Sequence, residues 1–307
     1  MKVLVTGGAG FIGSHIVDLL LERGDDVIVV DNLSTGQEAH LKPEVLFYRM
    51  DITDHRLSDV VAETRPEVVI HQAAQIDVPT SVRDPLHDAK TNIIGTLNLL
   101  EACRNAGVRK VVYASSAAVY GNPEYLPIDE KHPVAPLSGY GISKHTPEHY
   151  LQVYAQLHGL AYTVLRYANV YGIRQDPRGE GGVISIFVEK VLKGEPITVF
   201  GDGEQTRDYV YVEDVARANV AALNNGDGQI LNIGTGQKTS INELIALFEE
   251  VSGKKMEVHH APDRPGDIKH SYFDNRRAME ILNWRPETDL SVGLRKTLAY
   301  YREWITG

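Results

Sequence analysis

The chain has 307 residues and carries 31 lysines and arginines against 41 aspartates and glutamates, which leaves a formal net charge of −10. This length suffices for one large domain or two unequal domains with a sizeable core. No apolar run reaches the roughly 18 residues that a membrane-spanning helix needs, and the apolar residues at the start are too few for a signal peptide. We therefore expect a cytoplasmic protein.

The charge and the cysteine content exclude several kinds of partner and site. The acidic excess comes without any basic tract, so nucleic acids and anionic membranes are not expected partners. Cys103 is the only cysteine of the sequence, which rules out an internal disulfide and a thiolate metal cluster. An anionic ligand would need arginines placed locally at its site.

The first residues have the order strand, glycine turn, helix. A β-rich run at 2–6 leads into the segment GGAGFIG at 7–13, and an amphipathic helix pattern follows at 12–23. This order is typical of a dinucleotide site, where glycines let the backbone approach a pyrophosphate and the helix N-terminus donates N–H groups to it. An ordinary βα turn is the alternative. The residues expected to contact a cofactor here are Gly7, Gly10, Phe11, Ile12 and Gly13.

An acidic residue ends the second predicted strand. Asp31 follows the strand at 27–30, close to the ~20-residue offset expected of an acid that binds the adenosine ribose hydroxyls. Its charge repels a 2′-phosphate, and no lysine or arginine follows before Lys42. The sequence therefore predicts NAD rather than NADP. A simple loop or cap role for Asp31 is the alternative, which the agreement with the glycine turn weakens.

Strand-like and helix-like stretches alternate through the first half of the chain. Further strands are predicted at 45–49, 68–72, 110–115 and 162–166, and the longest helix at 86–105. The alternation predicts an α/β fold with a doubly wound parallel Rossmann sheet, which binds ligands at the carboxyl ends of its strands. The residues that follow these strands include Asp51, Ile52, Ala73, Ala74, Ser115, Ser116 and Asn169.

The expected division of the chain follows from where the sheet pattern stops. We expect an NAD-binding domain over 1–168 and a smaller C-terminal substrate-binding domain over 169–307. Segments around 207–235 are expected to return to the first domain. A loop is predicted at 171–182, a helix at 183–192 and a strand at 197–200.

Tyr140 and Lys144 are four residues apart, so on a helix they would share one face. An ammonium beside a phenol favours the phenolate, which can take a proton from an alcohol. The spacing alone is weak evidence, because it arises by chance in many helices. Ser116 strengthens it, since the fifth strand and the following helix both reach the edge where nicotinamide should lie. A hydroxyl there can relay the proton and hold the substrate oxygen.

Four segments resemble the extended short-chain dehydrogenase/reductases, and most closely the UDP-glucose 4-epimerase family. They are GGAGFIG at 7–13, DNL at 31–33, SSAAVYG at 115–121 and YGISK at 140–144. The resemblance covers essentially the whole chain. It implies NAD-dependent interconversion of UDP-glucose and UDP-galactose through transient oxidation at C4, with Ser116, Tyr140 and Lys144 as catalytic residues. The resemblance also implies Asp51 and Ile52 beside the adenine and Asn92 as a support of the cofactor site. Lys144 is expected to hold the nicotinamide ribose as well as the phenolate charge. The other expected cofactor contacts are Asn32, Ala73, Ala74, Ser115 and Tyr140.

Two alanines narrow the reaction. The 4,6-dehydratases of the resembling family place an Asp-Glu pair directly after the catalytic threonine, and the UDP-glucuronate decarboxylases keep a glutamate at the second of these positions. Here Ala117 and Ala118 stand there, and alanine cannot exchange a proton. Epimerisation needs one base and a hydride acceptor and remains the first hypothesis. Oxidation of a nucleotide sugar by NAD is an alternative. An NAD sensor without chemistry is another, which the Ser/Tyr/Lys set argues against.

The second half of the chain resembles the substrate-binding segments of the epimerases. The resemblance implies Arg207 and Arg264 as ligands of the UDP diphosphate, Asp267 as a ribose contact and Phe200 as the ring that packs on the uracil. Arginine suits a diphosphate because its planar fork donates paired hydrogen bonds. Phe200 could equally be an ordinary core aromatic, and either arginine a surface ion pair. The remaining predicted substrate residues are Ser116, Asn169, Val183 and Ser271.

Ser271 bears on the breadth of substrates. It stands four residues beyond Asp267, where some family members carry a tyrosine beside the sugar and others a cysteine or serine. A small residue leaves room for an N-acetyl group, so UDP-N-acetylhexosamines are expected alongside UDP-hexoses. The resemblance also implies a homodimer formed through helices at 86–105 and 139–157.

The sequence also contains a pattern that competes with this interpretation. His145, Glu148 and His149 read H-x-x-E-H, a signature of certain zinc peptidases. Two histidines four residues apart could share a zinc ion with the glutamate as base. Pro147 strains the helix that would align them, and no further ligand is apparent downstream. We therefore predict no metal site.

Overall fold

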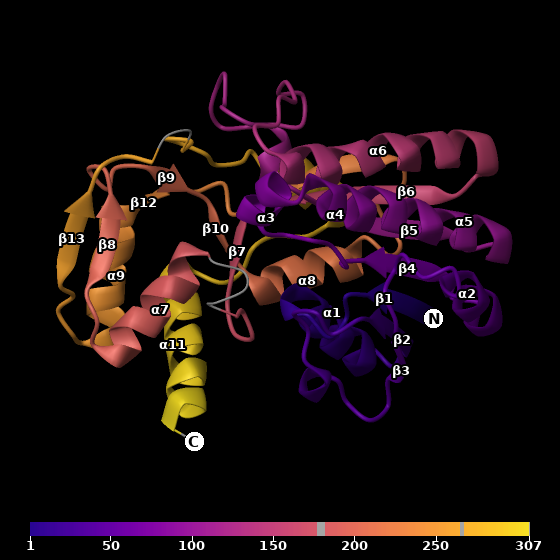
Figure 1. The fold of residues 1–307 in the computed structure, drawn as a ribbon, viewed down its shortest axis with the longest axis horizontal. Helices are drawn as coiled ribbons and strands as arrows, with labels where there is room; N and C mark the ends of the chain where they lie inside the picture. The colour runs from indigo at the N-terminus through magenta and orange to yellow at the C-terminus, as the bar shows by residue number, and fades with distance from the viewer. Residues whose placement is uncertain (177–181, 265–266, 307) are drawn as a thin grey trace.

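The computed structural model describes residues 1–176, 182–264 and 267–306. Seven parallel strands form the main sheet in the order β11-β6-β5-β4-β1-β2-β3 (Figure 1). Their bounds are β1 (Lys2–Thr6), β2 (Asp26–Asp31), β3 (Leu46–Arg49), β4 (Val68–His71), β5 (Lys110–Ser116), β6 (Ala161–Tyr167) and β11 (Gln229–Ile233). The strand order reverses between β1 and β4, which opens a crevice for ligands at the carboxyl edge. The predicted doubly wound parallel sheet is confirmed.

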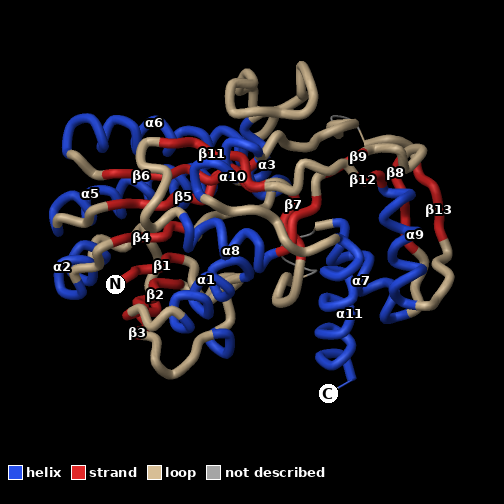
Figure 2. The backbone as a smooth tube through the Cα atoms, turned by 180° about the vertical axis from the view of Figure 1, so that it is seen from behind, coloured by secondary structure: helices blue, strands red, loops and turns tan. Residues whose placement is uncertain are grey.

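Helices cover both faces of this sheet because successive strand residues point to opposite sides. Val3 and Val5 belong to an apolar cluster with one set of helices, and Leu4 belongs to a second cluster with the other set. The first set is α1 (Phe11–Glu22), α8 (Val212–Ala221) and α10 (Arg276–Leu282); the second is α2 (Leu57–Thr64), α5 (Thr96–Ala106) and α6 (Gly139–His158). Figure 2 shows the strands in red between these helices.

The second half of the chain adds a smaller body beside the carboxyl edge (Figure 1). Three two-stranded sheets pair β7 with β10, β9 with β12, and β8 with β13. The elements are β7 (Asn169–Tyr171), α7 (Val183–Lys193), β8 (Ile197–Phe200), β9 (Thr206–Arg207), β10 (Tyr209–Tyr211), β12 (Thr239–Ser240), α9 (Ile241–Ser252), β13 (Val258–Ala261) and α11 (Leu290–Thr306). Phe187, Phe248 and Leu298 lie in the apolar cluster of this body. β11 departs from it and pairs with β6 in the main sheet.

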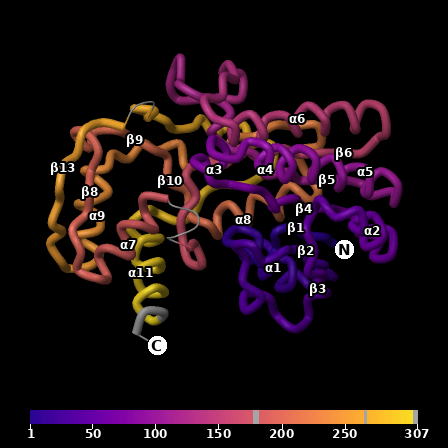
Figure 3. Tube along the Cα trace, viewed as in Figure 1, coloured from indigo at the N-terminus to yellow at the C-terminus, as the bar shows by residue number. Residues whose placement is uncertain are grey.

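Short helical segments connect the strands at the carboxyl edge. They are η1 (Glu38–His40), α3 (Val78–Arg83), α4 (Pro85–Ala89), η2 (Lys90–Gly95) and η3 (Ala117–Val119). Figure 3 shows the loop between η3 and α6 rising above α3 and α6. None of the described helices is long and apolar enough to cross a membrane.

Two predicted segments differ from the structure. The expected helix at 86–105 is built of α4, a π-helical turn η2 and α5. The loop expected from residue 171 begins later, because Tyr171 ends β7, which pairs with β10. The part of that loop at 177–181 lies outside the described residues.

Candidate active site

The glycine turn after β1 lets helix α1 pack directly against the strand ends. Gly7 has a positive φ of 68°, and a Cβ atom at Gly13 would lie 2.0 Å from the Gly7 carbonyl oxygen. Only glycine fits so close an approach. Gly10 caps α1 without a side-chain hydrogen bond, and the first turn holds no acid. The amides of this first turn are therefore available to an anion.

A cavity of about 400 Å³ lies at this edge of the sheet. It runs from the glycine turn along the ends of β2, β3 and β4, which suits an elongated dinucleotide. The predicted cofactor residues that line it are Gly7, Gly10, Phe11, Ile12, Gly13, Asp31, Asn32, Asp51, Ile52, Ala73 and Ala74. The structure thus brings together residues that the sequence places on four separate strand ends.

Asp31 closes the cavity where β2 ends. One carboxylate oxygen accepts the Ala9 amide at 3.0 Å, and the other accepts the Leu33 amide at 2.8 Å. Burial raises the pKa of Asp31, and the hydrogen bonds from Leu33 and Ala9 oppose that rise. Because each carboxylate oxygen accepts more than one bond, capacity remains for two sugar hydroxyls. The residues around Asp31 fit an adenosine ribose and leave no lysine or arginine beside it among those lining the cavity.

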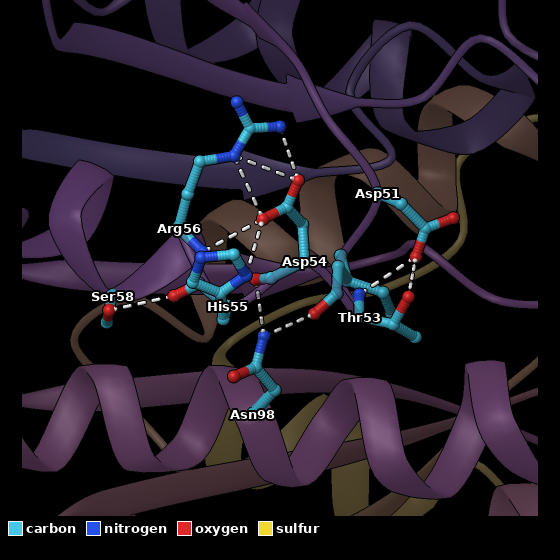
Figure 4. A network of polar contacts seen from close by, with 8 residues as sticks. Asp51, Thr53, Asp54, His55, Arg56, Ser58 and Asn98 are labelled. Atoms are coloured by element: carbon cyan, nitrogen blue, oxygen red, sulfur yellow. Dashed lines mark hydrogen bonds and ion pairs between the residues drawn. The ribbon is translucent and has the colours of Figure 1, made fainter.

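Asp51 organises the next strand end (Figure 4). It accepts the Thr53 amide at 2.8 Å with one oxygen and the Asn32 side chain at 2.8 Å with the other. Burial raises the pKa of Asp51, but the hydrogen bonds from Thr53 and Asn32 outweigh it and the net shift is downward. Asn98 of α5 donates to the Ile52 carbonyl at 2.7 Å. The network therefore fixes both the backbone and the side chains that line this end of the cavity.

Ser116 and Tyr140 come from two elements that touch. Ser116 ends β5, and its Oγ accepts the Ala118 amide at 3.2 Å. Helix α6 begins at Gly139, and a Cβ atom at Gly141 would lie 2.6 Å from the Ala118 carbonyl oxygen. The start of α6 therefore packs directly on the residues after Ser116, and half-buried Tyr140 stands at that junction.

Lys144 lies one turn further along α6 and is 4% exposed. Its Nζ stands 5.0 Å from the centre of the Tyr113 ring. Burial lowers the pKa of Lys144 to about 8, against the opposing charges of Glu148 and Asp88. The lysine is thus mostly charged at neutral pH, so that it favours the phenolate of a neighbouring tyrosine.

Asn92 lies inside the π-helical turn η2 and joins several elements. Its amide nitrogen donates to the Gln75 carbonyl at 2.8 Å and to Ser143 Oγ at 2.9 Å, while its oxygen accepts the Gln75 amide at 2.8 Å. Ser143 Oγ in turn donates to the Tyr140 carbonyl at 3.1 Å. Asn92 is buried and does not line the cavity, so it bears on the site through the start of α6.

The predicted nucleotide-binding residues gather around β8 and β9. The Arg264 guanidinium lies over the Phe200 ring, 3.8 Å from its centre. Arg207 and Asp267 form a long ion pair of 3.9 Å. The Ser271 amide donates to the Thr206 carbonyl at 3.1 Å, which holds the segment carrying Ser271 beside β9. These residues thus form one group, although they come from sequence segments sixty residues apart.

Asn169 and Val183 are placed at the ends of two other elements. The Asn169 amide donates to the Asp208 carbonyl at 2.9 Å, and Val183 is the first residue of α7. Buried Asp208 accepts the amides of Thr235 at 2.8 Å and Gly236 at 3.0 Å. Asp208 therefore anchors the chain between β9 and β10, a role that the sequence did not reveal.

Comparison with known proteins decides the family. The model of the NAD dependent epimerase/dehydratase family matches residues 3–234. The chain belongs to this family. A UDP-glucose 4-epimerase of Mycolicibacterium smegmatis is 46% identical over 98% of this chain and 99% of its own. A Thermotoga maritima UDP-glucose 4-epimerase solved with UDP-glucose is 49% identical, with a TM-score of 0.97 over 99% of this chain and 100% of the other. A Thermus thermophilus UDP-glucose 4-epimerase solved with NAD is 48% identical, with a TM-score of 0.93 over 98% and 99%.

This member of the epimerase/dehydratase family has cavity residues that the sequence did not single out. They follow β2 and β4 in turns or lie on α3, α4 and η2: Ser34, Thr35, Gln75, Ile76, Asp77, Thr80, His87 and Thr91. Most of them stand within ten residues of a strand end, but His87 and Thr91 lie further along the chain. No glycine spacing or charge pattern marks them, because the short helices that carry them are placed by tertiary contacts.

The H-x-x-E-H pattern has a structural use in this family member. Glu148 is fully buried, and its carboxylate pairs with Arg166 of β6 rather than facing the two histidines alone. His145 and His149 contact each other through their Nε2 atoms at 3.0 Å. The expected strain at Pro147 does not end the helix, since α6 continues through it. Pro147 has no N–H group, so it cannot donate to the Ser143 carbonyl. The next carbonyl along the helix, that of Lys144, accepts a hydrogen bond from the Tyr113 hydroxyl at 3.1 Å.

Proposed function

We propose that the protein is an NAD-dependent UDP-glucose 4-epimerase that interconverts UDP-glucose and UDP-galactose. One observation carries the proposal: Tyr140 and buried Lys144 stand one turn apart at the start of α6, packed on the residues after Ser116. This set lies at the sheet edge that also holds the dinucleotide-shaped cavity. Relatives of the same length with this activity support the proposal.

The cavity residues would hold the cofactor. The amides at the start of α1 would bind the pyrophosphate, and glycine at 7, 10 and 13 lets the backbone approach it. Asp31 would bind the adenosine ribose, and its charge would select NAD over NADP. Asn32, Asp51 and Ile52 would line the adenine end, and Ala73 and Ala74 line the cavity wall after β4. The nicotinamide of a bound NAD would supply the hydride acceptor for oxidation at C4 of the sugar and the hydride donor for the return step.

The chain's own residues manage the proton and the sugar oxygen. Tyr140, as phenolate, takes the proton from the O4 hydroxyl, and Ser116 holds that oxygen and relays the proton. Lys144 keeps the phenolate charged, because a cation next to a phenol favours its ionised form. A 4-keto sugar results, and it must turn within the site before the same tyrosine returns the proton. Ala117 and Ala118 offer no acid or base for elimination, so the keto sugar is preserved.

The second body of the molecule holds the nucleotide. Arg207 and Arg264 bind the diphosphate with their guanidinium forks. Phe200 packs on the uracil, and Asp267 accepts a ribose hydroxyl. Asn169, Val183 and Ser271 line the sugar side. Support comes from two neighbouring pairs, Arg264 over Phe200 and Arg207 with Asp267, which the hydrogen bond from the Asp267 amide to the Arg264 carbonyl at 3.2 Å joins.

Purified protein incubated with UDP-galactose and no added NAD tests this function. We expect UDP-glucose to appear, detected by coupling to an NAD-dependent UDP-glucose dehydrogenase after the protein has been removed. Turnover without added cofactor is expected because the NAD is regenerated in each cycle and need not leave. A stoichiometric oxidised sugar would favour a dehydrogenase instead, and no product even with added NAD would overturn the proposal.

Ser271 sets the space at the sugar in this proposal. The variant Ser271→Tyr should lose activity on UDP-N-acetylglucosamine by more than about tenfold, because a bulky ring fills the room for the N-acetyl group. Activity on UDP-galactose should change little. Ser271→Ala is the matched control and should retain both activities. Equal losses on the two substrates in Ser271→Tyr would contradict the role of Ser271.

We propose further that the enzyme is a homodimer. The helices α4, η2, α5 and α6 lie beside one another (Figure 3) and expose several large apolar side chains. These are Leu86 at 82%, Ile94 at 56%, Ile142 at 52%, Val153 at 44% and Leu157 at 67% exposure. A second copy of this face would cover them.

Sedimentation tests the dimer and should give twice the mass of one chain. The variant Leu157→Glu should shift the measured mass towards that of the monomer, because it places a charge in the proposed interface. A monomeric parent protein would refute the dimer.

A further inference from the structure

Glu148 binds three elements around the catalytic residues. Its Oε1 accepts Ser115 Oγ at 2.6 Å and Arg166 Nε at 3.0 Å. Its Oε2 accepts Arg166 Nη2 at 2.5 Å and lies 3.2 Å from His145 Nδ1. The residue is fully buried. A buried carboxylate that accepts a serine hydroxyl and two nitrogens of a paired guanidinium is held firmly in one place.

The partners of Glu148 are direct neighbours of the proposed catalytic residues. Ser115 precedes Ser116 at the end of β5, and His145 follows Lys144 in α6. Glu148 therefore ties the strand end that carries the serine to the helix turn that carries the lysine. Arg166, on β6, is itself fixed, because its guanidinium carbon lies 4.8 Å from the centre of the Tyr120 ring.

Glu148 is also one of two carboxylates that act on the Lys144 ammonium. The other is Asp88 of α4, which is 2% exposed. The further titratable groups around Lys144 are Tyr140 of α6, His71 of β4 and Tyr113 of β5. Burial, together with the charge of Lys144, lowers the pKa of His71 to about 3, and burial raises that of Tyr113, so both are neutral. Burial lowers the pKa of Lys144, and the charges of Glu148 and Asp88 oppose that effect and favour the ammonium form.

We propose that Glu148 is a positioning residue of the epimerase reaction, which sets Ser116 and the Lys144 ammonium relative to Tyr140 through Ser115 and the α6 turn. This inference rests on the proposed function. In this role Glu148, the glutamate of the H-x-x-E-H pattern, positions the catalytic residues without contacting the substrate. A purely structural Glu148–Arg166 pair would stabilise the fold and leave the reaction's pH dependence unchanged.

The variant Glu148→Gln tests the proposal. We expect kcat for UDP-galactose to fall by about tenfold to a hundredfold, because displaced groups lose the alignment for proton transfer. KM should stay near the parent value, because substrate contacts are intact. The alkaline limb of the kcat–pH profile should move to lower pH by about half a pH unit or more. The sign follows because Lys144 without Glu148's charge gives up its proton at lower pH, and the phenolate then loses its supporting cation.

The variant Glu148→Gln leaves Arg166 buried without a counter-charge, so its stability should fall. Two further variants separate that effect on folding from the effect on the reaction. The double variant Glu148→Gln/Arg166→Met removes that charge and should recover thermal stability, yet keep the shifted alkaline limb. Glu148→Asp keeps the charge but shortens the side chain, so kcat should fall while the limb stays in place. Glu189→Gln, on the distant helix α7, is the matched control and should behave as the parent.

The outcomes separate the two proposals. A parent protein with no epimerase turnover would overturn the proposed function and this inference with it. An active parent whose kcat–pH profile coincides with those of Glu148→Gln and the double variant would overturn this inference alone. Bound NAD, measured after denaturation of each variant, should equal the parent's; loss of NAD that accounts for the whole fall in kcat would likewise contradict a positioning role.

Discussion

Replacing Tyr140 by phenylalanine should lower kcat for UDP-galactose by about a thousandfold, because the proton of the O4 hydroxyl then has no base. The ring is kept, so the variant should fold as the parent does. NAD content should also be unchanged, because the variant keeps the proposed cofactor contacts of the glycine turn and of Asp31. The measurement is the steady-state rate of UDP-glucose formation together with the NAD released on denaturation.

Tyr150→Phe is the control for this experiment. Tyr150 lies on the same helix and is 38% exposed. Its loss of a hydroxyl matches the chemical change at Tyr140 without touching the site, so the rate should stay at the parent level. A Tyr140→Phe variant that keeps more than about a tenth of the parent rate would mean that another group takes the proton.

The second large effect is expected from Gly13→Ala. The added methyl group would lie 2.0 Å from the Gly7 carbonyl oxygen, which is backbone and cannot move aside. Helix α1 would have to shift away from the turn, and its first amides would leave the pyrophosphate site. We expect NAD affinity to fall by more than about tenfold, which corresponds to about 1.4 kcal/mol. The purified variant should contain little NAD and show activity only with added cofactor.

Gly253→Ala separates cofactor loss from general destabilisation. Gly253 ends α9 with a φ of 68°, and nothing lies within 4 Å of a Cβ placed there. Alanine at this positive φ costs about 1 kcal/mol of stability. The variant should therefore unfold at a lower temperature than the parent and still retain its NAD. If Gly13→Ala retained NAD as well as Gly253→Ala does, the proposed pyrophosphate site would be wrong.

The sheet could be predicted because its strands are short, apolar and β-branched, and each ends in a turn. The expected strand at 110–115 differs from β5 by one residue. The π-helical turn η2 could not be predicted, since its cause is tertiary. A Cβ atom at Gly95 would lie 2.7 Å from Ile52 Cδ1, and Thr96 Oγ1 lies 2.9 Å from His71 Nε2. The periodicity of apolar residues in the sequence does not reveal contacts with residues so distant in the chain.

Among the site residues, sequence reasoning found those with a backbone or charge signature. Glycine spacing marked the α1 turn, and the Tyr140–Lys144 spacing marked the start of α6. The residues that hold neighbouring segments in place were not predicted. Asp208, Asn98 and Arg166 act through hydrogen bonds to segments that are distant in the sequence. Glu148 was noticed only for the zinc pattern, since sequence spacing does not tell which way a buried carboxylate points.

The pairing of Arg207 with Asp267 has a consequence for which anions can compete. At 3.9 Å, with Asp267 about half exposed, the pair is weak and easily exchanged. In the proposed binding mode, a nucleotide sugar that takes over Arg207 would offer Asp267 a ribose hydroxyl in return. Inorganic pyrophosphate would offer Asp267 no hydroxyl and would place two negative groups side by side. Under the proposed function, Asp267 would therefore favour whole nucleotide sugars over inorganic pyrophosphate.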